Sequence, residues 1–296
     1  MAILSRGFDQ TNLTGSVGGV TYRRVGGVTV ASQKVPMHVK AKQTISLMAT
    51  RMRWPNLVAL WRALNRKDWH PSFLGTSKRV SDFNRFMATN FAIANIYLPK
   101  PLVRAGAGVV SVVCVTEGSL TAISCGFGTG NVPTTDLAVG TLTLGNSTTL
   151  AAFSQAIIAN NPSQGWQDGD QLTLLTLTQV TDSQGVIRIS THVDEVTLDS
   201  NGDTTMLSDL IDIARYTVTD GKLAWAAAVI GGVTAVHSRL VDGETVCSTQ
   251  YLEINNPAAA QYSTASAFRG ACESYGGFVQ NAMLTPNIGD DFAFGV

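Results

Sequence analysis

Residues 16–32 read SVGGVTYRRVGGVTVAS, in which the pentad Val-Gly-Gly-Val-Thr occurs at 17–21 and again at 25–29. Two β-prone runs, 20–25 and 28–32, flank Gly26-Gly27, and a two-residue Gly-Gly loop supplies the positive φ angles of a tight hairpin turn. A phosphate-binding loop would need Gly-Lys-Ser/Thr followed by a helix, and neither is present. The stretch therefore predicts a β-hairpin. Because an isolated hairpin is only marginally stable in water, we expect it to pack on another surface.

The residues that follow the hairpin read as an extended arm, so that 1–44 form one hairpin-and-arm unit. Residues 33–44 contain Pro36 and three lysines. An arm that needs support from outside is more typical of an assembly device than of a catalytic one. We therefore expect six residues of this unit to contact a neighbouring subunit: Tyr22, Arg23, Arg24, Lys34, Lys40 and Lys42.

Residues 45–104 are expected to form a basic helical segment. A helix is predicted over 45–65, with a break or a fresh start at Trp54-Pro55 because proline is tolerated in a first turn. Ser81 is a suitable N-cap for a second helix. The stretch LPKPL at 98–102 ends this segment and marks a domain boundary. Four apolar residues at helical spacing predict the buried stripe of the first helix: Leu57, Leu60, Trp61 and Leu64.

From 105 to 296 the residue pattern changes to short β-prone runs separated by Gly, Asp and Asn, such as DQLTLLTLTQV at 170–180. This pattern predicts a β-sandwich, immunoglobulin-like although it lacks a Cys–Trp–Cys signature. Two helices are expected to interrupt it, near 150–159 and 206–214. The region is either one larger β domain or two modules, 105–180 and 181–296. The predicted fold class is α+β, mainly β.

The net charge of zero conceals a polar distribution of charge along the chain. Residues 1–104 hold 16 Lys/Arg and 3 Asp/Glu (16 − 3 = +13), and 105–296 hold 5 and 18 (5 − 18 = −13). Copies of such a chain attract one another head to tail, through an interaction that salt weakens.

No catalytic, cofactor or metal site is predicted from the motifs. The four histidines are interpreted as isolated residues, with neither metal-ligand spacing nor a nearby carboxylate pair: His38, His70, His192 and His237. The stretch GFGTGN at 126–131 does not satisfy the dinucleotide motif. Asp199, Asn201 and Asp203 start a calcium-loop pattern, but Thr204 and Leu210 stand where it requires Gly and Glu, which favours a tight turn. The four cysteines lack CxxC spacing and are expected to be reduced core thiols. The longest apolar run, 223–230, is too short to span a membrane.

Two binding functions remain as alternatives. Arginines and lysines of 51–85 alternate with Trp54, Trp61, Trp69, Phe83 and Phe86, as in surfaces that bind phosphates and stack bases. Against this, the aromatic residues fall at core-facing positions, and no helix-turn-helix, zinc-finger or RNA-binding signature is present. A carbohydrate-binding β-sandwich used in host attachment would draw on Trp166 and Trp225, which the sequence suggests are exposed.

The stretch GSVGGVTYRRVGGVTVASQKV at 15–35 resembles the opening of an uncharacterised protein family common in Bacteroidota and their crAss-like phages. The stretch AAAVIGGVTAVHSRLVDGETVCSTQYLEI at 226–254 is similar to the closing pattern of that family. The resemblance implies a hairpin, a basic helical segment and β-sandwich modules in a virion component, such as a ring or collar protein of a tailed phage. No catalytic residues come with it, and this chain shows no clear second copy of the β module.

The sequence therefore favours a non-enzymatic structural subunit, located in the neck or tail of a virion and synthesised in the host bacterial cytoplasm. The expected partners are other copies of the chain in a homo-oligomeric ring and neighbouring virion proteins. Non-specific contact with DNA is the third expected interaction, and neither a cofactor nor a membrane is expected.

Overall fold

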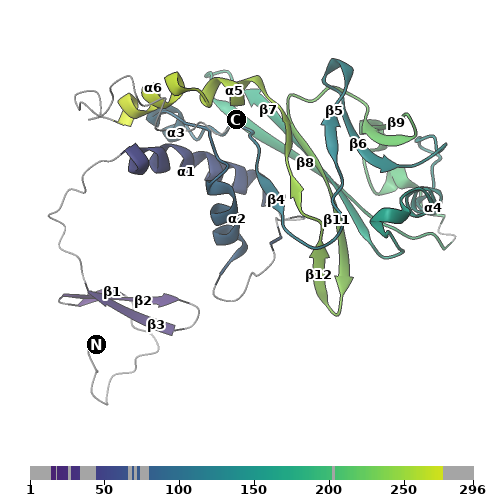
Figure 1. Cartoon of the computed structure of the whole chain (residues 1–296), viewed down its shortest axis with the longest axis horizontal. Helices are drawn as coiled ribbons and strands as arrows, with labels where there is room; N and C mark the ends of the chain where they lie inside the picture. Colours follow the sequence, from purple (N-terminus) through teal and green to yellow (C-terminus); the bar gives the residue numbers. More distant parts are fainter. Residues whose placement is uncertain are drawn as a thin grey trace, which may run out of the picture.

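The computed structural model describes residues 15–17, 19–25, 28–33, 45–65, 69, 72–73, 80–201 and 204–275. Within these ranges the chain forms six α-helices and fourteen strands, and all the named strand pairs are antiparallel (Figure 1). The predicted class, an α+β fold with sandwich-like sheets, is confirmed.

The N-terminal hairpin forms as predicted and gains a third strand. Strands β2 (Val20–Val25) and β3 (Val28–Gln33) pair with Val25 opposite Val28, so their connection has two residues. Strand β1 (Gly15–Val17) pairs with the other edge of β2. We call these three strands the arm sheet. In Figure 1 the arm sheet stands apart from the helices and the large sheets.

The helical segment contains α1 (Ile45–Leu64), α2 (Asp82–Phe91) and α3 (Lys100–Arg104). The hydroxyl of Ser81 accepts a hydrogen bond from the Asn84 backbone N–H, which confirms the predicted N-cap of α2. Leu57, Leu60 and Leu64 are fully buried, as their spacing predicts. The expected break at Trp54-Pro55 is wrong, because α1 continues through Pro55. Burial of residues on both sides of the proline offsets the backbone hydrogen bond that proline removes.

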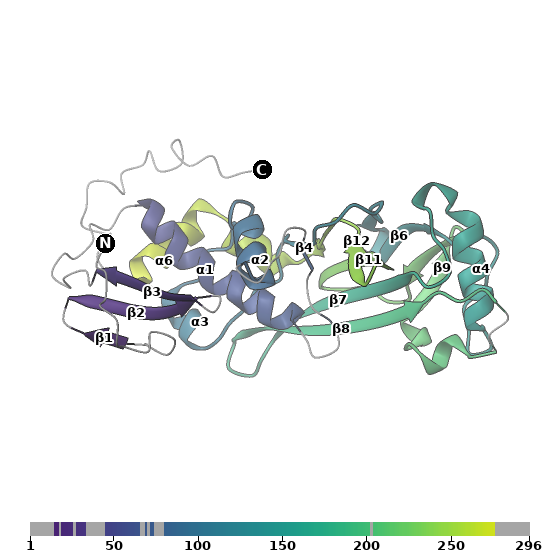
Figure 2. The same ribbon diagram turned by 90° about the horizontal axis from the view of Figure 1, so that it is seen from below.

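The centre of the fold is a large antiparallel sheet. Its strand order is β12 (Glu244–Cys247), β11 (Gly231–Val241), β7 (Gln171–Thr181) and β8 (Ile187–Thr197), and β14 (Glu253–Asn255) also pairs with β11. β4 (Cys114–Thr116) and β13 (Gln250–Tyr251) form a separate pair. In Figure 2, β7 and β8 run together from α1 toward the opposite end of the molecule.

That opposite end holds a smaller sheet and one helix. The smaller sheet has the order β5 (Cys125–Phe127), β6 (Pro133–Ala138), β10 (Lys222–Trp225) and β9 (Tyr216–Thr219). Helix α4 (Leu150–Asn160) starts at Thr149, whose hydroxyl accepts from the Ala152 N–H. This helix confirms the prediction for 150–159.

The large sheet is buried on both faces because its central strands are apolar in both alternating sets of positions. On β7, Leu172 and Leu174 pack in one hydrophobic core with the small sheet and α4. Leu175 and Leu177 point to the other face and pack in a second core with α1 and α2. Strand side chains alternate between the two faces, so β7 separates and supports both cores.

In 105–296 the strand pairing bears on the alternative that the sequence left open, and the helices differ from those expected. β7 and β8 pair along their full length across position 180/181, which is incompatible with separate modules divided there. The helix expected over 206–214 is reduced to the 3-10 turns Leu207–Asp209 and Ile213–Arg215. The β region also ends in two unpredicted helices, α5 (Pro257–Tyr262) and α6 (Ala265–Tyr275).

Helix α6 returns to the N-terminal helices rather than extending the sandwich. Phe268 and Cys272 pack with Met48, Met52 and Tyr97 in a small core of their own. The rings of Tyr97 and Phe268 meet edge to face, with their centroids 5.0 Å apart. Apolar contacts with residues far away in the sequence therefore determine where α6 packs.

Within the described ranges, no helix combines the length and the apolar character required to cross a bilayer.

Candidate functional site

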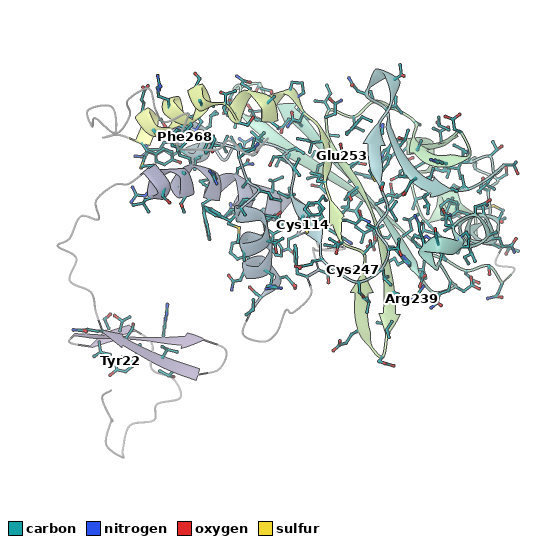
Figure 3. All side chains as sticks on the ribbon, in the orientation of Figure 1. Tyr22, Cys114, Arg239, Cys247, Glu253 and Phe268 are labelled. Atoms are coloured by element: carbon teal, nitrogen blue, oxygen red, sulfur yellow. The ribbon has the colours of Figure 1, made fainter. Side chains whose placement is uncertain are left out.

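The predicted subunit-contact residues divide between the arm sheet and the chain beyond it. Tyr22, Arg23 and Arg24 lie on β2, the central strand of the arm sheet, where Tyr22 stands opposite Gly15 and Ala31 (Figure 3). Arg23 is exposed and Tyr22 is half-buried. The other three predicted contact residues, Lys34, Lys40 and Lys42, lie outside the described residues.

The described side chains of the arm sheet form no apolar core. None of its described side chains is buried, and Val30 keeps 37% of its surface exposed. Small sheets need an apolar face or a packing partner to be stable in water. The arm sheet therefore offers a face that another surface can cover.

The β11–β12 hairpin presents an exposed surface of opposite charge. Leu240 and Val241, at its end, are 69% and 43% exposed. Asp242 and Glu244 continue the turn and are exposed as well, and Asp242 has a positive φ of 52°. We call Leu240–Glu244 the acidic tip. It forms the lower end of the β11–β12 hairpin in Figure 1.

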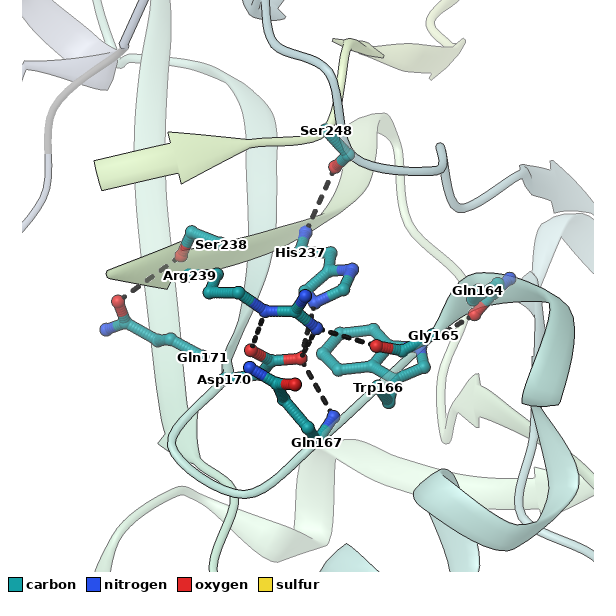
Figure 4. Close-up of polar contacts among 10 residues, drawn as sticks. All are labelled: Gln164, Gly165, Trp166, Gln167, Asp170, Gln171, His237, Ser238, Arg239 and Ser248. Atoms are coloured by element: carbon teal, nitrogen blue, oxygen red, sulfur yellow. Dashed lines mark hydrogen bonds and ion pairs between the residues drawn. The ribbon is translucent and has the colours of Figure 1, made fainter. Parts of the chain in front are cut away.

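The densest polar cluster of the β region centres on Asp170, at the start of β7 (Figure 4). Arg239 donates from Nε to Oδ1 at 2.6 Å and from Nη2 to Oδ2 at 2.7 Å, a bidentate pair. His237 Nε2 lies 2.9 Å from Oδ2, and the Gln167 backbone N–H donates to the same oxygen at 2.9 Å. The Trp166 ring stacks on His237 with centroids 3.7 Å apart.

The protonation states in this cluster follow from burial and pairing. Burial alone would raise the pKa of Asp170, but the bonds from Arg239, His237 and Gln167 outweigh it and hold that pKa below its usual value. Burial lowers the pKa of His237, although Asp170 partly opposes the shift. His237 is therefore a neutral imidazole whose Nε2–H donates to the carboxylate.

This cluster is a structural clamp rather than a catalytic triad. The side chains of Asp170 and His237 have no exposed surface, so no substrate reaches them. Ser248 completes an apparent Ser-His-Asp set, but its Oγ accepts from the backbone N–H of His237, and the remaining ring nitrogen, Nδ1, has no hydrogen-bond partner. The catalytic arrangement requires the base to contact the nucleophile. What the cluster does is fix the loop at 165–170 to β11.

A second carboxylate–histidine pair lies on β8. Asp194 Oδ2 is 2.8 Å from His192 Nε2 and accepts a hydrogen bond from the Tyr216 hydroxyl at 2.6 Å. Burial and the nearby Asp194 charge raise the pKa of Tyr216 far above its usual value. A phenol held in its neutral form serves here as a donor that joins the large sheet to β9.

The treatment of His192 and His237 as isolated residues is thus wrong. Asp194 lies two positions from His192, and this spacing places both side chains on one face of a strand. That signal was available in the sequence. Asp170 lies 67 positions from His237, so only the pairing of β7 with β11 brings them together. His38 and His70 lie outside the described residues.

The tight turn expected at 199–203 agrees with the contacts of its described part. The Asp199 carboxylate accepts from the Asn201 backbone N–H, and the Asp168 carboxylate accepts from Ser200. Asp203 lies outside the described residues. The described residues contain no group of three or more His, Cys, Asp or Glu that could hold a metal ion.

The cysteines are free thiols, as expected for core residues. Cys114, Cys247 and Cys272 are buried, and Cys125 is half-buried. Burial raises the pKa of Cys114 and Cys125 to about 12 and that of Cys272 to about 11. Such thiols are protonated at neutral pH and are poor nucleophiles.

The aromatic residues behind the two alternative functions are mostly packed inside. The expected exposure of Trp166 and Trp225 is wrong, because they are only 5% and 3% exposed and therefore present no ring to a sugar. In the helical segment Phe86 is fully buried and Trp69 is 9% exposed, as their core-facing spacing predicts. Trp54 differs, with 45% of its surface exposed.

No protein family, curated protein or solved structure matches this chain.

Proposed function

We propose that the chain is a non-enzymatic structural subunit of a tailed-phage particle that assembles with copies of itself through its N-terminal arm. The observation that carries this proposal is the arm sheet, which is paired internally yet has no buried side chain among its described residues. A covering surface on a neighbouring subunit would supply the apolar burial that the described side chains of the sheet lack.

Charge favours a head-to-tail contact between copies. The arm sheet carries Arg23 and Arg24, whereas the acidic tip carries Asp242 and Glu244 beside exposed Leu240. The arm of one copy would bind the acidic tip of the next copy. Such a contact joins two different surfaces, and repeated copies close into a ring when the rotation between them permits.

The assignment to a phage neck or tail comes from the resemblance of 15–35 and 226–254 to a phage-associated family. A ring or collar fits a subunit that binds its neighbours through one projecting arm. Electron microscopy of native particles, with an antibody against the large-sheet region, would place the chain on the neck or tail. Labelling of host cell debris alone would refute the virion assignment.

The assembly test is light scattering of the full chain across protein concentration and salt. We expect oligomers at about 0.05 M salt that dissociate toward about 0.5 M, since the Debye length falls severalfold over this range. Arg23→Glu should weaken association, Glu244→Lys should weaken it similarly, and the two together should restore part of it. Lys222→Glu reverses an exposed charge on β10 and serves as the matched control.

Two outcomes would contradict the assembly proposal. One is a strict monomer at every protein and salt concentration, with or without the other particle proteins. The other is an oligomer that persists unchanged when residues 1–44 are deleted. Since the cores identified in the described chain are formed by residues from 48 onward, this deletion leaves their apolar contacts in place.

A further inference from the structure

A groove of about 520 Å³ lies where α1, the segment after α3 and β8 meet. Its apolar lining includes Val58 and Ala59 of α1, Val103 of α3 and Ile189 of β8. Trp54 lies at the same groove with 45% of its surface exposed. An exposed tryptophan beside an apolar groove is typical of a surface that binds an aromatic or aliphatic segment.

The groove is also basic. Arg62 and Arg188 both line it. Arg188 is oriented by two bonds, from Nε to Asp182 at 3.1 Å and from Nη1 to the Gly106 carbonyl at 3.0 Å. Arg62 is exposed, and no described carboxylate forms an ion pair with it. The chemistry selects an occupant that combines apolar side chains with negative charge.

One segment of this chain has that composition. Of the stretches longer than two residues outside the described ranges, 276–296 is the only one with net negative charge. It contains the run Asp-Asp-Phe-Ala-Phe at 290–294 and no lysine or arginine. The two adjacent carboxylates of this run are complementary to the guanidinium groups of Arg62 and Arg188, and its two aromatic rings are complementary to the apolar lining of the groove.

The described chain ends close to this groove. The Lys100 backbone N–H, at the start of α3, donates to the Ser274 hydroxyl of α6 at 2.9 Å. The Lys100 ammonium lies 6.0 Å from the centroid of the Tyr275 ring, the last described residue. Val103 lines the groove less than one helical turn further along α3, a rise of about 5 Å. A connection as long as 276–289 can span at most roughly 45–50 Å, which is sufficient for the run to reach the groove.

We propose that residues 290–294 bind in this groove of their own chain. The Phe292 and Phe294 rings would cover Val58 and Ala59, and the Asp290 and Asp291 carboxylates would pair with Arg62 and Arg188. A covalent connection of this length gives an effective concentration of about millimolar order. Binding within one chain therefore precedes binding between copies at ordinary protein concentrations. The inference does not depend on the arm or on assembly.

The test uses the full chain with a photo-crosslinking benzophenone amino acid at position 292. Unlabelled and nitrogen-15-labelled protein are mixed before irradiation, and mass spectrometry of the products shows which chains are joined. We expect crosslinks to 54–63 or 103–108 within one isotopic species. Arg62→Glu should lower their yield about tenfold, because it removes a charge-assisted contact and adds a repulsion. Adding Asp291→Arg to Arg62→Glu should restore them.

Lys222→Glu should leave the yield unchanged, since Lys222 lies on the small sheet. Arg62 is exposed, so its substitution does not threaten the core, and circular dichroism of each variant checks the fold. Mixed pairs that join a labelled to an unlabelled chain, at the statistical share that contacts between copies give, would overturn binding within one chain. Crosslinks elsewhere on the surface, or a yield that Arg62→Glu does not change, would overturn the groove assignment.

Discussion

Replacing Asp170 by Asn tests whether the clamp between the 165–170 loop and β11 holds the β region together. The substitution keeps the size of the side chain but removes its charge. It leaves one acceptor oxygen for Arg239, His237 and the Gln167 N–H, and its new amide N–H₂ faces groups that already donate. Asp170 is fully buried, whereas the Arg239 side chain is 22% exposed and retains partial access to water.

The expected loss of unfolding free energy is about 3–5 kcal/mol, the range observed when one partner of a buried charge pair is removed. Because the Arg239 side chain retains partial access to water, the loss of unfolding free energy should lie toward the lower end of that range. At about 2–4 °C per kcal/mol for a chain of this size, the melting temperature should fall by roughly 6–20 °C. Activity plays no part in this expectation.

The assay is urea-induced unfolding followed by far-ultraviolet circular dichroism and by tryptophan fluorescence, to which Trp166 of the clamp contributes. Asp212→Asn is the matched control, because Asp212 also pairs with an arginine, Arg215, but is 52% exposed. Exposed pairs contribute at most about 1 kcal/mol. Equal losses in the two variants would refute the view that the Asp170 clamp stabilises the fold.

Three further outcomes are expected. The free energy of unfolding should fall as pH drops below about 6.5, the ordinary pKa of histidine, because the pKa of His237 is lowered in the folded chain and the unfolded chain takes up the proton more readily. His237→Phe should flatten this part of the pH–stability curve. A curve that His237→Phe leaves unaltered would contradict the assignment to His237. Gly231→Ala should lower the free energy of unfolding by about 3 kcal/mol or more, because φ at Gly231 is 149° and a Cβ would overlap the Leu177 carbonyl. A urea midpoint equal to that of the parent protein would contradict this expectation. Thiol titration at pH 8 should label Cys114, whose pKa is raised to about 12, slowly in the native protein and rapidly after unfolding, and rapid native labelling would show that the site opens.

The clamp and the Tyr216–Asp194 pair have one role in common. Each fixes a segment of the β region to a strand of the large sheet, at Arg239 on β11 and at Asp194 on β8. The clamp also accounts for the burial of His237 and Trp166.

Local patterns in the sequence were sufficient for features that depend on a few neighbouring residues. The Gly26-Gly27 connection between two alternating β-prone runs predicted β2 and β3, and the structure confirms both strands. Ser81 predicted the start of α2 because a cap acts within three residues. The spacing of Leu57, Leu60 and Leu64 predicted their burial, since one face of a helix repeats every three to four residues.

Features that depend on contacts between distant segments appeared only in the tertiary structure. α1 continues through Pro55 because packing on both sides outweighs the local preference for a break. Trp166 and Trp225 are buried by partners that no local pattern reveals: His237, 71 positions away from Trp166, and Thr176, 49 positions away from Trp225. The separation of basic and acidic residues along the chain predicted attraction between copies. The strand pairing, which the sequence did not reveal, places Arg239 against Asp170 and leaves the acidic tip exposed to solvent. Chain connectivity specifies which residues are near in sequence, whereas strand pairing and the burial of apolar surface specify which are near in space.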